Sequence, residues 1–138
     1  MKPKNFSQQM TTRHTLKVKY FTLFTAIAYS IAIVFFSLIN LDRVLKVEIN
    51  ASDKTLHTIS YGFLFLIWSL YFYIKQKHIS LRLNFILAWV LVAFGIIIEA
   101  IQGLYTSYRT FDWWDAFANT LGVSIAFIIC VVLKKLFN

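Results

Sequence analysis

Long apolar stretches separated by short polar segments divide the chain into four parts. The first runs from Phe21 to Ile39 without a charged side chain, and comparable stretches follow at about residues 55–74, 83–102 and 114–133. About 20 apolar residues are needed to cross the roughly 30 Å hydrocarbon layer, and backbone hydrogen bonds in lipid must close within the segment. The pattern therefore predicts an all-α membrane protein, a bundle of four transmembrane helices.

The segments between these stretches contain no repeat or low-complexity tract, so we expect residues 1–138 to form a single transmembrane domain. Only 14% of the residues are charged, against about 25% in a typical soluble domain. The net charge of +8 would suit nucleic-acid binding, but the basic residues flank apolar spans instead of forming a soluble face. We expect membrane lipids, and no nucleic acid, as partners.

Lysine and arginine are distributed unequally between the two ends of the predicted spans. Ten lie in the two terminal tails and around residues 75–82, whereas four lie in the other two connecting segments. Because short loops rich in Lys and Arg stay in the cytoplasm, both termini are expected inside, in a multi-pass protein of the inner (cytoplasmic) membrane. Every acidic residue then falls on the extracytoplasmic side, namely Asp42, Glu48, Asp53, Glu99, Asp112 and Asp115.

Three polar motifs meet at that extracytoplasmic level. One opens the second span at residues 53–61, one closes the third span at residues 99–102, and one leads into the fourth span at residues 109–122. Charged groups within a bilayer are costly and normally face the bundle interior. We therefore expect an inward-facing cluster of ligand-binding candidates that consists of Asp53, Lys54, His57, Tyr61, Glu99, Gln102, Arg109, Asp112, Asp115 and Asn119.

The cluster is compatible with three roles. It could be a buried ion-pair and hydrogen-bond network that fastens three helices. It could recognise an anionic envelope group, with Lys54, His57 and Arg109 as cationic donors. It could also be catalytic, with His57, Glu99 and Asp115 as acid–base candidates. No established catalytic motif is present, so enzyme activity stays open; no cofactor is predicted, although the same residues are compatible with a divalent metal. The oligomeric state is open as well.

In this order, the motifs resemble those of the VanZ-like family of small bacterial integral membrane proteins. The matching pattern is Asp53-Lys54-x-x-His57-x-x-x-Tyr61, then Glu99-x-x-Gln102, then Arg109-x-x-Asp112-x-x-Asp115-x-x-x-Asn119-x-x-Gly122. It covers about residues 53–125, and the first span fits the usual layout.

The family is named for an accessory protein of glycopeptide-antibiotic resistance, associated with low-level teicoplanin resistance, and no reaction comes with it. The resemblance implies a role at the extracytoplasmic membrane surface, on or near a cell-envelope component. The alternatives are a small membrane enzyme that modifies a lipid-linked or anionic envelope substrate, and a structural membrane subunit with a buried polar network.

Overall fold

The computed structural model describes residues 6–39, 53–105 and 111–137. This part of the chain forms four helices, namely α1 (Phe6–Leu38), α3 (Asp53–Gln76), α4 (Leu81–Tyr105) and α5 (Trp113–Phe137). All four are long and apolar enough to cross a membrane. The predicted all-α, four-span architecture is therefore confirmed, and each predicted span coincides with one of these helices apart from Ile39.

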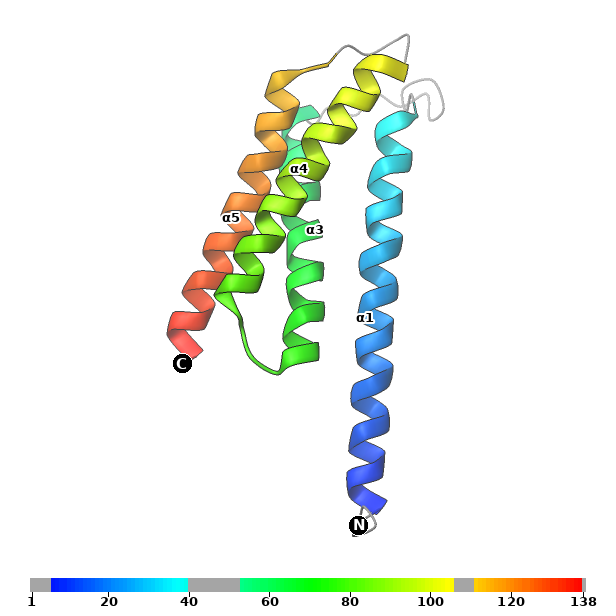
Figure 1. The fold of residues 1–138 in the computed structure, drawn as a ribbon, viewed down its shortest axis with the longest axis vertical. Helices are drawn as coiled ribbons and strands as arrows, with labels where there is room; N and C mark the ends of the chain where they lie inside the picture. Colours follow the sequence, from blue (N-terminus) through cyan, green and yellow to red (C-terminus); the bar gives the residue numbers. More distant parts are fainter. Residues whose placement is uncertain (1–5, 40–52, 106–110, 138) are drawn as a thin grey trace.

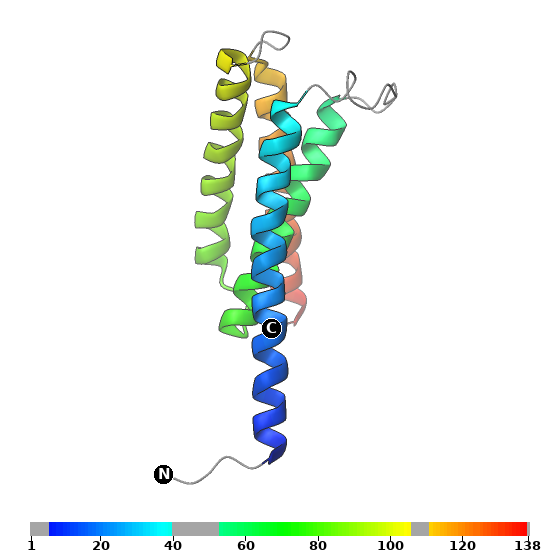
Figure 2. The same cartoon turned by 90° about the vertical axis from the view of Figure 1, so that its right-hand side faces the viewer.

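Successive helices run in opposite directions, so the start of α1 and the end of α5 point toward the same end of the bundle (Figure 1). We call the other end, where α1 and α4 finish and α3 and α5 begin, the polar end. The first turns of α1 extend well past the other three helices (Figure 2). The location of both termini in the cytoplasm stays a prediction, but the topology places both terminal helix ends on one side.

Local hydrogen bonds explain where α4 and α5 begin. Asp112 precedes α5, and its carboxylate accepts the backbone N–H of Trp114 at 2.8 Å, which is the bond of an N-cap residue. Ser80 has the same place before α4, where its hydroxyl accepts the backbone N–H of Leu83 at 3.4 Å. Between α3 and α4 the chain turns at Lys77, whose φ of 61° is a left-handed conformation that closes the end of α3.

The core lies between α3, α4 and α5, with the side chains of Tyr61, Leu64 and Phe65 buried at its centre. Large apolar side chains such as Phe24 and Trp89 are instead exposed on the outside of the bundle. A soluble protein would hide them, whereas in a bilayer they contact lipid at no cost.

Two glycines bring α3 and α5, which run in parallel, into backbone contact. A Cβ atom at Gly122 would overlap the carbonyl oxygen of Thr58 and lie 3.0 Å from the backbone nitrogen of Gly62. One turn closer to the polar end, the Thr58 hydroxyl donates to the carbonyl of Ala118 at 3.2 Å. This contact sets the register of the two helices and so determines which of their polar side chains meet.

Candidate functional site

A chain of hydrogen bonds joins three helices at the polar end. His57 of α3 lies with its Nδ1 3.0 Å from Asn119 Oδ1 of α5. The Asn119 amide nitrogen donates to Glu99 Oε1 of α4 at 3.4 Å. Asn119 and Glu99 are almost completely buried, with 1% and 2% of their surface exposed. Gly95 makes this approach possible, because a Cβ there would lie only 3.2 Å from the Asn119 Cβ.

A second set of contacts lies closer to the surface. The Lys54 ammonium is 3.1 Å from a carboxylate oxygen of Asp112 and 3.1 Å from one of Asp115. Lys54 and Asp112 are partly exposed, whereas Asp115 is buried. The backbone N–H of Trp114 and the Lys54 ammonium hold the pKa of the Asp112 carboxyl below its ordinary value.

The other ring nitrogen of His57 faces two carboxylates. Its Nε2 lies 3.9 Å from Asp53 Oδ1 and 3.9 Å from Asp115 Oδ2, beyond hydrogen-bond distance. One ligand atom from each of these three residues lies within 4.8 Å of the others. Asp53 is half exposed and Asp115 is buried, so this face of the imidazole opens toward the polar end.

Two more buried polar side chains border the cluster. The Gln102 amide donates to the backbone carbonyl of Ser37, which ties α4 to α1. Tyr61 is 99% buried, and its hydroxyl has no hydrogen-bond partner among the described residues. A Cβ at Gly95 would lie 3.0 Å from Tyr61 Cε1 and 3.3 Å from Asn119 Nδ2, so the Tyr61 ring lies beside the buried part of the cluster.

Carboxylate groups outnumber cationic groups among the described residues of this cluster. Asp53, Glu99, Asp112 and Asp115 supply four carboxylates, whereas Lys54 supplies the one ammonium among the described residues of the cluster. With a neutral imidazole and ionised acids, these groups leave several negative charges at the edge of a low-dielectric bundle. Such an arrangement favours an added cation, a hydrogen-bond donor or a proton.

Comparison with known proteins agrees with this picture. A family model described as VanZ/LLP1 matches residues 2–134, nearly the whole chain. The chain belongs to the VanZ/LLP1 family. No curated protein and no solved structure matches it. The predicted resemblance to VanZ-like proteins is thus confirmed, and the polar cluster belongs to a VanZ/LLP1 membrane domain.

The structure of this VanZ/LLP1 member brings together most of the candidates predicted from the sequence. Eight of them contact one another or border the cluster directly: Asp53, Lys54, His57, Tyr61, Glu99, Asp112, Asp115 and Asn119. Gln102 lies at the same end of the bundle and is bonded to α1. Arg109 lies outside the described residues. Whether these side chains bind a ligand stays a prediction.

Sequence reasoning missed two participants. Thr58 bridges α3 and α5 through its hydroxyl, and its position one turn after Lys54 was the available signal. The Ser37 carbonyl accepts the Gln102 bond, and no side-chain pattern reveals a backbone acceptor.

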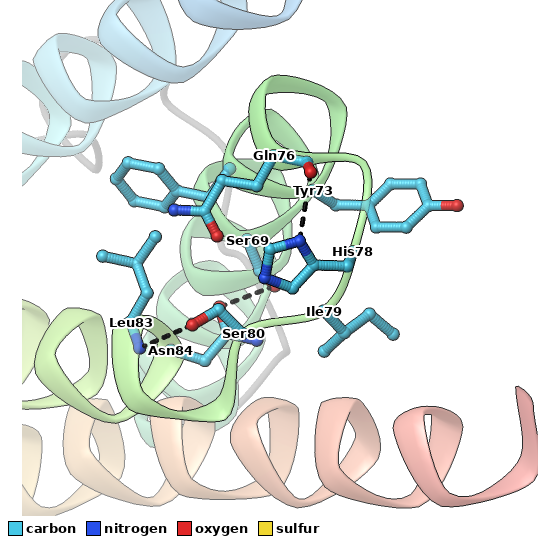
Figure 3. A pocket seen from close by; sticks show the side chains of 9 residues that line it. Ser69, Tyr73, Gln76, His78, Ile79, Ser80, Leu83 and Asn84 are labelled. Atoms are coloured by element: carbon cyan, nitrogen blue, oxygen red, sulfur yellow. Dashed lines mark hydrogen bonds between the residues drawn. The ribbon is translucent and has the colours of Figure 1, made fainter. Parts of the chain in front are cut away.

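The opposite end of this VanZ/LLP1 domain is a weaker candidate for a functional site than the polar end. A pocket at the α3–α4 turn is lined by Ser69, Gln76, His78, Ser80 and Asn84, among others (Figure 3). Its volume is about 10 Å³, room for about one water molecule. The Ser69 hydroxyl donates to Asn84 there, and His78 Nδ1 contacts the backbone carbonyl of Gln76. These bonds account for the polar groups locally.

Two larger grooves face the lipid. One, of about 320 Å³, is lined by α1, α3 and α4, and the other, of about 300 Å³, is lined by α4 and α5. Their linings are apolar apart from the hydroxyls of Ser30, Thr120 and Ser124 and the indole N–H groups of Trp68 and Trp89. The Trp68 indole N–H donates to Ser30. The residues that line these grooves include no titratable side chain. The grooves therefore suit lipid acyl chains and offer no group for acid–base chemistry.

Proposed function

We propose that this VanZ/LLP1 protein acts at the extracytoplasmic surface of the cytoplasmic membrane, on a cell-envelope component that it binds at the polar end. The observation that carries the proposal is the burial of Glu99, Asp115 and Asn119 around His57 at one end of the bundle. Apolar side chains would fasten these helices at least as well, because burying charges costs desolvation energy that their pairing seldom exceeds. Ionisable groups buried inside a membrane-spanning bundle usually mark functional sites.

The asymmetry of charge supports the extracytoplasmic side. Lys75, Lys77, Lys134 and Lys135 flank the end opposite the cluster, and short basic flanks remain in the cytoplasm. The cluster then opens toward the cell envelope, where Asp53 and Lys54 are accessible from water.

The ligand class follows from the contacts of Lys54. Its ammonium is held between buried Asp115 and partly exposed Asp112. An anionic envelope group, such as a lipid phosphate or a peptide carboxylate, would take the place of Asp112 on Lys54 and leave the bond to Asp115 intact. This exchange keeps the Lys54 ammonium and buried Asp115 paired, while the partly exposed Asp112 carboxylate retains the Trp114 N–H and faces water.

The experiment is a comparison of teicoplanin susceptibility in cells that produce the wild type or His57→Gln at equal abundance. Glutamine retains hydrogen bonding but cannot titrate or replace an imidazole Nε2. We expect the wild type to lower teicoplanin susceptibility relative to cells without the protein, and His57→Gln to insert and fold yet to lose this protection. The matched control is His78→Gln at the opposite, cytoplasmic end, which should behave like the wild type. Equal protection by all three proteins would remove His57 from the site and contradict the proposal.

A structural subunit is the second candidate, and specific bonds favour it. The Glu99–Asn119–His57 chain and the Gln102–Ser37 bond together tie all four helices at one end. In that case substitutions in the cluster should reduce stability in proportion to their effect in cells. The comparison of stability and function for Glu99, described in the Discussion, separates the two candidates.

A further inference from the structure

The protonation pattern of His57 is set by its neighbours. A carboxyl oxygen of Glu99 accepts the hydrogen bond that the amide nitrogen of Asn119 donates. The Asn119 oxygen is then turned toward His57 Nδ1 at 3.0 Å, which makes Nδ1 the donor. In a neutral imidazole the lone pair is therefore on Nε2. A hydrogen bond from one ring nitrogen to a fixed acceptor is the usual support of a metal-binding histidine.

The lone pair of Nε2 faces the two carboxylates of Asp53 and Asp115, each 3.9 Å away. A lone pair opposite two anions is unfavourable unless a metal cation or a proton lies between them. Two ligand atoms at about 2.0–2.2 Å from one ion lie roughly 3–4 Å apart, so both Nε2–carboxylate distances fit a shared ion. A small contraction would bring all three ligand atoms, which lie within 4.8 Å of one another, into this range. Half-exposed Asp53 gives an ion a route from water.

The Tyr61 hydroxyl is a second, independent observation. It is 99% buried without a hydrogen-bond partner among the described residues, and its ring lies beside Asn119 over Gly95, one turn of α3 after His57. Leaving a buried hydroxyl unsatisfied costs about 1–3 kcal/mol. A ligand oxygen or a water held in the cluster would satisfy it. The hydroxyl thus points to an occupant in the cluster that the side chains alone do not provide.

We propose that Asp53, His57 Nε2 and Asp115 bind a divalent cation of the zinc class. One imidazole nitrogen with two carboxylate oxygens suits Zn²⁺ or Mn²⁺ better than Ca²⁺ or Mg²⁺, which take oxygen ligands. Asn119 and Glu99 are positioning residues that fix the imidazole. Three protein ligands leave at least one coordination position open, and an anionic oxygen of the envelope ligand fits there. That last assignment rests on the proposed function, whereas metal binding does not.

The test uses purified full-length protein in detergent, treated with a chelator and then titrated with Zn²⁺. A background variant with His14→Ala and His78→Ala retains His57 alone among the three histidines of the chain. Histidine labelled with ¹⁵N then reports both ring nitrogens of one residue. We expect about one Zn²⁺ per chain, with the Nε2 resonance shifting on binding while Nδ1 stays protonated.

The matched pair of variants is Asp53→Asn and Asp112→Asn. Both remove one partly exposed carboxylate at the polar end, but only Asp53 faces Nε2. Asp53→Asn should weaken Zn²⁺ binding by about tenfold or more, whereas Asp112→Asn should retain it.

Three results would overturn the proposal: no Zn²⁺ binding by the background variant, protonation of both ring nitrogens at saturating Zn²⁺, or equal losses from both variants. Loss of teicoplanin protection in His57→Gln without Zn²⁺ binding by the background variant would reject the metal and leave the proposed function standing.

Discussion

Gly122→Ala should disrupt the polar cluster from a distance, because the contact between α3 and α5 sets its register. The added methyl group would overlap the carbonyl oxygen of Thr58, 2.9 Å from the carbonyl carbon, and these backbone atoms cannot rotate away. Overpacking of this kind costs about 1–3 kcal/mol. Loss of the Thr58–Ala118 bond adds about 1 kcal/mol, and the helix preference of alanine over glycine returns about 1 kcal/mol. A net loss of about 1–3 kcal/mol follows.

The assay is equilibrium unfolding in mixed micelles, with Ser124→Thr as the control. Ser124 is exposed two residues further along α5, so the same addition of a methyl group meets lipid instead of a helix. We expect the control to stay within about 0.5 kcal/mol of the wild type. A Gly122→Ala protein as stable as its control would refute the reasoning that the glycine contact holds the two helices in register.

Two further predictions concern the environment of the polar end. The pKa of Asp112 is lowered in the folded protein, so the ionised Asp112 carboxylate should stabilise the fold above its ordinary pKa. This stabilisation should disappear as the pH falls through the lowered value. The unfolding free energy of Asp112→Asn, measured over the same acid range, should lack this pH dependence. In a Cys130→Ala background, cysteine at Ser107 should react with a membrane-impermeant thiol reagent in intact cells while cysteine at Gln76 should not, and the opposite labelling would reverse the orientation.

The fold was predictable because a bilayer imposes simple requirements on sequence. Four predominantly apolar stretches of about 20 residues leave helices as the solution, and the helices extend past these stretches where polar residues continue them. The clearest case is α1, which begins at Phe6 and not near Phe21. Its first turns are basic and polar, so hydrophobicity does not mark them, although nothing in that segment breaks a helix.

The composition of the cluster was predictable for the same reason, whereas its internal pairing was not. Polar residues near one membrane face had to converge, and His57, Glu99 and Asn119 do. The partner of Lys54, by contrast, depends on the register of α3 against α5, which the glycine contact fixes in three dimensions. Spacing along one helix carries no information about that register.

The central claim is that the polar end is a binding site and not merely a polar network that holds the helices together. Glu99→Gln tests this claim most directly. Glutamine has nearly the same shape and can still accept the Asn119 bond, but it removes a buried negative charge from beside His57. Stability in micelles and teicoplanin protection in cells would be measured on the same variant. Our account predicts unchanged or increased stability together with lost protection. Lower stability together with intact protection would contradict it.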